Sequence, residues 1–392
     1  MRLVFASVPD YYKSVGILGS QYSPDMDPNA DRKMDWVLLW AMLAVIVMGL
    51  VNLYSAATDP LSATTGYFLK QVIYYGIGFV LMGAILFFDY RFYERIAYVL
   101  YGLNFLALLL VRLPGIGIYR NGARQWINLG PVMFQPSETM KLALIMALAA
   151  YFHNKVRSMR MGVRELLVPS LIVVAPVLLI VMQPDMGTGM HLFITGSSIL
   201  FFVGIQRRIL LTVTLLGIIS APIVWQYGLK EYQRDRIRTF LDPTRDPRGH
   251  GYNALQSKIA VGSGEIFGKG FTKGTQTQLD FTPEGHTDFI FSVLAEEWGF
   301  VGCLLLLAAY LLLLSRIVSI ALMAQDRFAM LIAIGVLTMI SSQVVINIFM
   351  VIGLFPIVGI PLPLASYGGS SALNVCASLG LVLNIGYRRG IF

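Results

Sequence analysis

WVLLWAMLAVIVMGLVNLYSAA, residues 36–57, is a nearly continuous apolar stretch without a single charged side chain. At 1.5 Å per residue, a helix of about 20 residues crosses the hydrocarbon core of a bilayer. The stretch therefore predicts a membrane-spanning helix. Of all 392 residues, 56% are hydrophobic and 13% are charged, whereas soluble domains carry about 25% charged residues. This composition leaves too little polar surface to cover a soluble globule.

Similar apolar stretches recur along the rest of the chain. They predict an all-α, polytopic transmembrane helical bundle of about ten spans. Residues 1–35 are polar and irregular and are expected to form a cytoplasmic tail, followed by one membrane domain over residues 36–392. The predicted spans are 36–57, 70–88, 95–113, 137–153, 166–183, 187–205, 208–227, 288–314, 327–354 and 369–387.

Lysine and arginine placement predicts the orientation, because cytoplasmic loops of membrane proteins hold the excess of basic residues. With the N-terminus inside, the inner segments hold sixteen lysines and arginines and the short outer loops hold four. Both termini are therefore predicted to be cytoplasmic. This asymmetry accounts for the net charge of +8 better than nucleic acid does, so nucleic acid is not an expected partner.

The segment 228–287, between the seventh and eighth predicted spans, is a long outer loop with nine basic residues. Loops beyond about 15 residues are usually functional or disordered, and the amphipathic stretch 254–261 predicts a short helix at the membrane surface. The charges indicate either a solvated loop near anionic headgroups or a site for a phosphorylated ligand. In the second interpretation the phosphate would bind cationic side chains, chosen from Arg234, Arg236 and Arg238, with Lys258 or Lys269.

Charged residues inside predicted spans need a partner or a wet cavity. Glu138 and Lys141 open the fourth span at i, i+3 spacing, which indicates either a structural ion pair or the lining of a cavity. Asp185 stands in the sequence QPDMGT, where proline and glycine break the helix between two spans. Glu296 and Glu297 lie within the eighth span, so at least one of them should meet a polar partner.

The sharpest polar motif is His286-Thr287-Asp288, where the outer loop enters the eighth span shortly after Glu284. Asp288 is expected in the first turn of that helix, where the positive end of the helix dipole favours a carboxylate. Helix capping alone would explain the residue. The alternative interpretation is catalytic, because the carboxylate borders a basic outer loop and has a histidine two residues away.

Other chemistries find no support in the sequence. There is no phosphate-binding P-loop and no paired-histidine metal spacing, and Gly262-Ser263-Gly264 lacks a dinucleotide-binding context. Cys303 and Cys376 both lie in apolar runs, so neither a disulfide framework nor a metal cluster is expected.

Several longer motifs resemble one known family. They are GARQWI at 122–127, FQPSE at 134–138, QPDMGT at 183–188, PEGHTDF at 283–289 and PLPLASYGGS at 361–370. From about residue 35 to its C-terminus, the chain is similar to the SEDS family of bacterial cell-wall polymerases. The motifs FGKGF at 267–271 and GIPLP at 359–363 further resemble the elongation branch of that family, rather than its division or sporulation branches.

The resemblance implies a peptidoglycan glycosyltransferase of the bacterial cytoplasmic membrane, which polymerises lipid II on the outer face during cell elongation and rod-shape maintenance. It also implies a class B penicillin-binding protein as partner. The family's essential loop aspartate falls on Asp288 and its outer-loop tryptophan on Trp126, although Gln125 stands where many relatives have an arginine. The expected substrate-binding residues are Trp126, Arg124, Glu138, Lys141, Asp185, Arg234, Arg236, Arg238, Lys258, Glu284 and His286.

Polymerisation needs a base for the proton of the attacking hydroxyl and positive charge for the departing pyrophosphate. Asp288 is the expected base. Two lipid-linked substrates must enter laterally, which predicts a groove between helices, open to the outer leaflet. No cofactor is required, and the sequence leaves open whether a divalent cation takes part.

The alternative function is a lipid II flippase, because many spans, buried charges and a broken helix also suit a transporter. A flippase needs a polar path through the full membrane depth, whereas the sharpest cluster here lies on the outer side. A third interpretation is a membrane scaffold without catalysis.

Overall fold

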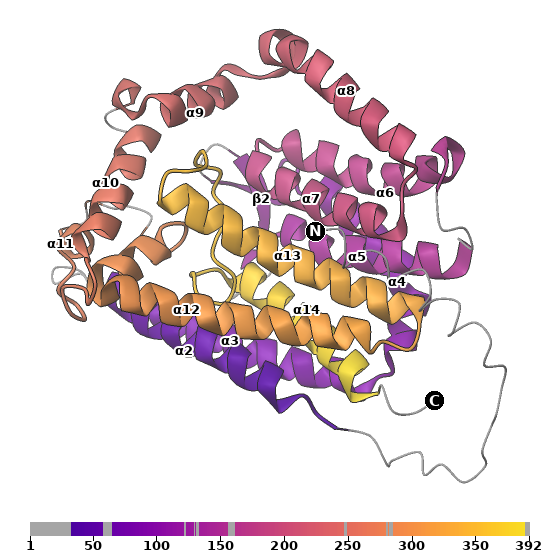
Figure 1. Cartoon of the computed structure of the whole chain (residues 1–392), viewed down its shortest axis with the longest axis horizontal. Coiled ribbons are helices and arrows are strands. Elements are labelled where there is room, and N and C mark those ends of the chain that lie inside the picture. The colour runs from indigo at the N-terminus through magenta and orange to yellow at the C-terminus, as the bar shows by residue number, and fades with distance from the viewer. Residues whose placement is uncertain are drawn as a thin grey trace.

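The computed structural model describes residues 33–57, 65–120, 123–128, 130, 133–155, 161–246, 249–279, 281 and 285–388. Within these ranges the chain is a bundle of long helices with one small sheet, as the apolar stretches predict (Figure 1). Residues 1–32 of the predicted tail lie outside the described residues. The long helices are α2 (Trp36–Ala56), α3 (Thr65–Phe87), α4 (Tyr90–Leu110), α5 (Pro136–Lys155), α6 (Val163–Val181), α7 (Met186–Val203), α8 (Arg207–Ile223), α12 (Ile290–Leu322), α13 (Arg327–Val351) and α14 (Gly369–Tyr387).

Among the described residues, nine helices are long and apolar enough to cross a membrane. The predicted fourth span corresponds to α5, which is not one of the nine because its sequence is less apolar. Residues 143–150 of α5 are all buried, and the helix packs against α4, α13, α7, α14 and α6. A helix enclosed by protein does not need an apolar surface toward lipid. The count of ten spans therefore stays a prediction.

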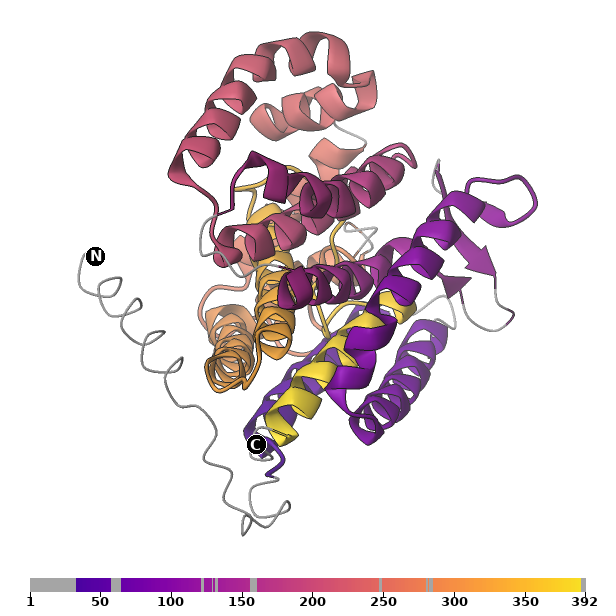
Figure 2. The same cartoon turned by 90° about the vertical axis from the view of Figure 1, so that its right-hand side faces the viewer.

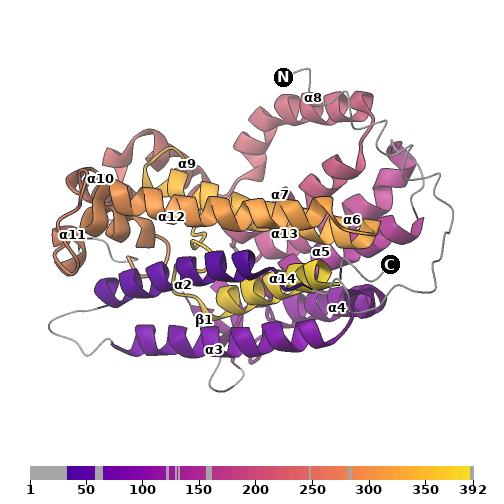
Figure 3. The ribbon, with the colours of Figure 1, turned by 60° about the horizontal axis from the view of Figure 1, so that its bottom comes forward.

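Further helix pairs run side by side around this central helix, and α3 and α14 run in the same direction, because Gly78 lies against Cys376 and Met82 against Gly380. α3 lies along α14, and α2 lies along α12, as Figure 3 shows. α8 differs from the rest, because it has no buried residue and lies apart from the bundle on the same side as α9 (Figure 2).

A three-stranded antiparallel sheet fills the connection between α4 and α5. Its strands are β1 (Gly117–Arg120), β2 (Ala123–Asn128) and β3 (Met133–Phe134), in the order β1-β2-β3. Ser370 joins the sheet to the start of α14: its hydroxyl accepts from the backbone N–H of Gln135 at 3.1 Å and donates to the carbonyl of Met133 at 3.0 Å. The sheet is thereby held at the outer end of the bundle.

The described part of the long outer loop is mostly helical, as its amphipathic stretches predict. After the π-helical turn η1 (Val224–Gly228) it forms α9 (Glu231–Leu241), the 3₁₀ turn η2 (Pro243–Arg245), α10 (His250–Ser263) and α11 (Thr275–Gln278). The predicted stretch 254–261 lies within α10. In Figure 1 the α10–α11 region sits beside the outer end of α12.

The outer loop is attached where α12 is interrupted at Gly299, whose φ of 62° is not helical. The interruption frees backbone groups that must find other partners. The N–H groups of Lys269 and Gly270 donate to the carbonyls of Glu296 and Glu297, each at 3.0 Å. The loop therefore completes the hydrogen bonding of the broken helix.

Buried carboxylates strengthen this attachment: at least one of Glu296 and Glu297 is expected to meet a polar partner, and both do. Glu296 is fully buried and accepts from the Lys269 ammonium at 2.7 Å. The hydroxyl of Thr275 also donates to Glu296 at 3.1 Å, and the hydroxyl of Ser55 on α2 donates to Glu297. Lys269 thus has a structural role as the partner of Glu296, and the prediction that it contacts phosphate finds no support.

We predict that Lys269→Met loosens the outer loop. Removing one partner of a buried ion pair costs about 3 kcal/mol, because the other charge stays buried. If this cost lowers the free energy of local opening of the loop, the fraction of molecules with an opened loop rises roughly a hundredfold. Limited proteolysis of the purified protein in detergent would show this as faster cleavage within residues 265–279.

The control is Lys273→Met, because Lys273 lies in the same loop, is exposed and has no carboxylate partner among the described residues. Equal cleavage rates for the two variants would contradict the proposed anchoring.

Candidate active site

Asp288 lies just outside the helix that was predicted to contain it. α12 begins at Ile290 with Phe289 as its N-cap, and Asp288 belongs to the preceding turn. The expectation that Asp288 occupies the first helical turn is therefore wrong. Asp288 precedes the N-cap by one residue, so its carboxylate lies at the edge of the region where the helix dipole acts.

A buried amide fixes the backbone at Asp288. The side-chain nitrogen of Asn347, fully buried on α13, donates to the carbonyl of Asp288 and to that of Ile360, both at 2.8 Å. Asn347 thus joins the entrance of α12 to the chain that follows α13. Asn347 cannot be recognised from the sequence, because one asparagine in an apolar span does not reveal what it will contact.

The chain after α13, residues 353–360, contacts three functional regions; we call it the 353–360 segment. A Cβ at Gly353 would overlap the Lys258 side chain, and the φ of 75° there also favours glycine. At the start of α7, a Cβ on Gly187 would overlap the carbonyl of Val358. One carboxylate oxygen of Asp288 lies 3.4 Å from the place that a Cβ on Gly359 would take. One segment therefore contacts Lys258 at one end and the start of α7 and Asp288 at the other.

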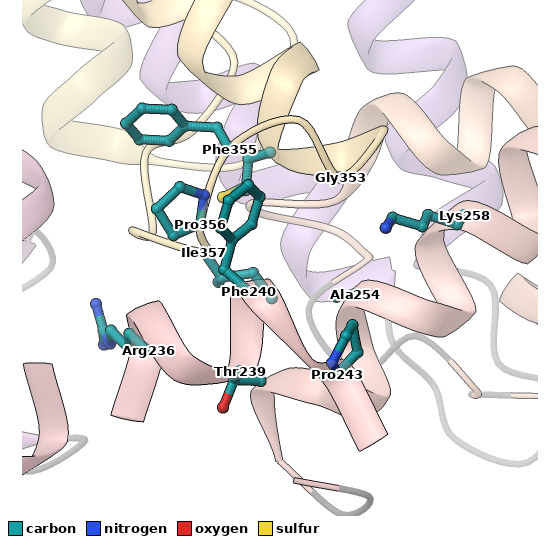
Figure 4. Close-up of a pocket in the computed structure, with 11 residues that line it drawn as sticks. Arg236, Thr239, Phe240, Pro243, Ala254, Lys258, Gly353, Phe355, Pro356 and Ile357 are labelled. Carbon is teal, nitrogen blue, oxygen red and sulfur yellow. The ribbon is translucent and has the colours of Figure 1, made fainter. Parts of the chain in front are cut away.

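Arg236 and Lys258 line one small pocket beside this segment (Figure 4). Their side chains stand on opposite sides of Phe240 and Pro356 in Figure 4. The enclosed space is only about 20 Å³, which holds roughly one water, so a phosphate group would bind at the mouth of the pocket. The further lining residues are Thr239, Pro243, Ala254, Met350, Gly353, Phe355 and Ile357.

The other two predicted arginines of α9 have structural partners. Arg234 donates to the carbonyls of Gln226 and Leu229 at 3.1 and 3.0 Å. Arg238 forms ion pairs with Glu231 at 2.7 Å and with Asp235 at 3.1 Å. Neither lines the pocket, so of these three arginines Arg236 is the one that reaches it.

A group of polar side chains lies deeper in the bundle, between α5 and α7. Glu138 and Lys141 are buried and form the predicted ion pair at 2.7 Å. Asp185 is the N-cap of α7, where it accepts from the N–H of Thr188 at 3.0 Å. The fully buried His191 lies 2.9 Å from the carbonyl of Met339.

Several polar atoms in this group and on the neighbouring helix α13 have no protein partner within the described part of the chain. They include one carboxylate oxygen of Glu138, one ring nitrogen of His191 and both amide atoms of Gln343. Buried polar atoms of this kind are normally satisfied by internal water. The group is therefore more than a single structural ion pair, which favours the cavity-lining interpretation.

The remaining predicted residues lie around the outer end of the bundle. His286 stacks on Tyr67 of α3, with ring centroids 4.8 Å apart, and its carbonyl accepts from the N–H of Tyr367 at 3.0 Å. Trp126 is half-buried in β2, opposite Ile118. Glu284 lies outside the described residues.

Arg124 is not part of the pocket of Arg236 and Lys258, but lines a separate hollow with Arg112. Within the described ranges, no three histidine, cysteine, aspartate or glutamate side chains gather as a metal site would require. The site therefore contains one carboxylate and one cationic pocket that contact the same 353–360 segment, with a cluster of polar side chains deeper in the bundle.

Comparison with known proteins assigns the chain to a family. Residues 36–390 match the model of the FtsW, RodA and SpoVE family, described as cell cycle proteins. The chain is 38% identical to the peptidoglycan glycosyltransferase MrdB of Escherichia coli K12, covering 93% of this chain and 98% of that protein. It is also 38% identical to the stage V sporulation protein E of Bacillus subtilis, covering 90% and 96% respectively.

Solved structures agree with this assignment. A chain from a peptidoglycan synthase complex that coordinates polymerization and crosslinking superimposes with a TM-score of 0.77 at 34% identity, covering 91% of this chain and 98% of the other. The rod shape determining protein RodA of Thermus thermophilus gives a TM-score of 0.66 at 32% identity, covering 90% and 96%. The protein is therefore a multi-pass membrane protein of the FtsW, RodA and SpoVE family.

Proposed function

We propose that this protein is a peptidoglycan glycosyltransferase that polymerises lipid II into glycan strands during cell elongation. Its relatives include a named peptidoglycan glycosyltransferase and RodA, matched over nearly their full lengths. The observation that carries the proposal is the 353–360 segment, which contacts both Lys258 and Asp288. The reaction would take place at the outer face of the bacterial cytoplasmic membrane, where the distribution of lysine and arginine predicts this segment to lie.

The proposed reaction joins the sugars of two lipid-linked substrates. A sugar hydroxyl attacks the anomeric carbon of the second sugar, the new glycosidic bond forms, and the bond to the lipid pyrophosphate breaks. Asp288 takes the proton of the attacking hydroxyl as general base. Arg236 and Lys258 stabilise the negative charge that develops on the departing pyrophosphate.

This assignment uses the groups that the geometry leaves available. Arg236 and Lys258 have no carboxylate partner among the described residues, whereas Arg234, Arg238 and Lys269 each have at least one. A cation that is already paired gains less from binding phosphate, because it must first give up its partner. The proposed reaction needs no resident cofactor, since side chains supply both the base and the positive charge.

We further propose a class B penicillin-binding protein as the partner. The similar synthase complex couples polymerization with crosslinking, and crosslinking of a new glycan strand requires a transpeptidase. A partner at the outer face would receive the strand directly from the polymerase.

The buried group between α5 and α7 favours lipid II transport as the second candidate function. An ion pair with unsatisfied polar neighbours inside a bundle is also found along transport pathways. Polymerisation by the purified protein in detergent separates the two functions. Transport cannot be measured in detergent, because no membrane separates two compartments.

We predict that Asp288→Asn lowers the rate of lipid II polymerisation by about 10²–10⁴-fold, the usual contribution of a general base. The amide cannot accept the proton, although it has nearly the same shape. The measurement is glycan strand formation by the purified protein with lipid II in detergent, resolved by gel electrophoresis.

Asp235→Asn serves as the matched control, because Asp235 is an exposed acid of the outer loop whose only described ion pair is with Arg238. Near-normal polymerisation by the Asp288→Asn variant would end the assignment of Asp288 as base. An inactive unmodified protein in the same assay would instead favour transport.

We also predict that Arg236→Gln and Lys258→Gln each lower kcat/KM for lipid II by roughly 10- to 100-fold, the effect of losing one charge-assisted hydrogen bond. Arg238→Gln, two residues along α9, should remain within about twofold, because exposed ion pairs contribute little. If all three variants lost activity equally, the pocket would not be the pyrophosphate site.

A further inference from the structure

A second cationic hollow opens at the outer ends of α4 and α6. Its volume is about 310 Å³, and its lining comes from three parts of the chain: the end of α4, the β1–β2 hairpin and the corner between α6 and α7. The lining residues are Arg112, Tyr119, Ala123, Arg124, Met182, Gln183 and Pro184. None of them lines the pocket of Arg236 and Lys258.

Both charged residues of this hollow are arginines. Arg112 follows α4 by two residues, and Arg124 lies in β2 directly opposite Tyr119 of β1. Neither arginine has a carboxylate partner among the described residues, and no acidic residue lines the hollow. Asp185 comes next in the chain, but its carboxylate is occupied at the start of α7. Two like charges facing one space repel each other, and a bound anion would relieve that repulsion.

A buried glutamine builds the hollow as a defined site. Gln183 is 4% exposed, and its side-chain amide donates to the carbonyl of Leu108 on α4 at 2.8 Å. The backbone carbonyl of Gln183 accepts a hydrogen bond from the side-chain amide of Gln125 in β2 at 3.1 Å. One residue thus ties together all three parts that form the lining. The two arginines are therefore carried by backbone that is fixed before any ligand binds.

The rim indicates the kind of anion. Tyr119 is 68% exposed and Met182 is 56% exposed, so apolar surface lies beside the cations at the ends of membrane helices. Tyrosine and arginine at this level are typical of contacts with lipid headgroups. The surface suits a ligand with a phosphate head and an apolar tail. Arginine forks match phosphate oxygens bidentately, which favours phosphate over other anions.

We propose that this hollow binds the pyrophosphate group of the second lipid-linked substrate. This inference rests on the proposed function, because polymerisation needs two such lipids and the pocket of Arg236 and Lys258 accounts for one. The corner that forms one wall of the hollow continues into α7, where Gly187 contacts Val358 of the 353–360 segment. Lipids in the two sites would therefore flank the segment that contacts Asp288.

The test counts bound lipids by native mass spectrometry of the purified protein with undecaprenyl pyrophosphate, and separately with phosphatidylglycerol. We expect two molecules of undecaprenyl pyrophosphate on the unmodified protein. We expect one on the Arg112→Gln, Arg124→Gln double variant, and one on the Arg236→Gln, Lys258→Gln double variant. Lys70→Gln, which removes another outer-side cation, should still bind two.

The outcomes separate the sources of phosphate. Loss of one undecaprenyl pyrophosphate from the Arg112→Gln, Arg124→Gln variant, with phosphatidylglycerol binding unchanged, supports the proposal. Loss of phosphatidylglycerol alone would overturn it and make the hollow a phospholipid site. An unchanged count of both lipids would also overturn it.

A kinetic arm distinguishes failure of this inference from failure of the proposed function. The exposed single variant Arg112→Gln, which should fold normally, is expected to raise the lipid II concentration for half-maximal polymerisation about tenfold. An unchanged concentration, with the unmodified protein active, would overturn the second site and leave the polymerase intact. If the unmodified protein made no glycan at all, the proposed function would fail, while the lipid count would still decide whether the hollow binds pyrophosphate.

Discussion

Close backbone contact along the 353–360 segment is the constraint on which the outer face of this protein depends. Glycine at 353 and at 187 leaves room for Lys258 and for the carbonyl of Val358, where any side chain would collide. Irregular backbone at the end of a membrane helix must also satisfy its polar groups within the protein. Asn347 does this by bonding the carbonyls of both Asp288 and Ile360. The Lys258 side chain, the Asp288 carboxylate and the starts of α7 and α12 are thereby held in one arrangement.

Much of the architecture could be predicted because lipid imposes simple rules on sequence. Length and hydropathy located the long helices, and i, i+3 spacing predicted the ion pair of Glu138 and Lys141, which the structure confirms. The cost of burying charge predicted polar partners for Glu296, and Lys269 is one of them. The span 137–153 also corresponds to a helix, α5, although its sequence is less apolar than the others, because a helix surrounded by protein is not selected for contact with lipid.

Details of the site depend on three-dimensional placement that spacing does not encode. Arg234, Arg236 and Arg238 alternate along one helix, yet only Arg236 reaches the pocket, because the other two find partners nearby. The start of α12 lies two residues beyond Asp288, a shift within the usual uncertainty of helix boundaries. Arg112 and Arg124 come from different elements, so only the fold could bring them to one hollow.

The most direct test of this account is the initial rate of lipid II polymerisation by Gly353→Ala, compared with Gly262→Ala in the nearby helix α10. A Cβ at 353 would displace Lys258, whereas a Cβ at 262 meets nothing within 4 Å. Since small misplacements of a catalytic group can cost about a hundredfold, we predict a loss of that order for Gly353→Ala in correctly folded protein and a normal rate for Gly262→Ala. Equal rates for the two variants would show that the 353–360 segment does not organise the site.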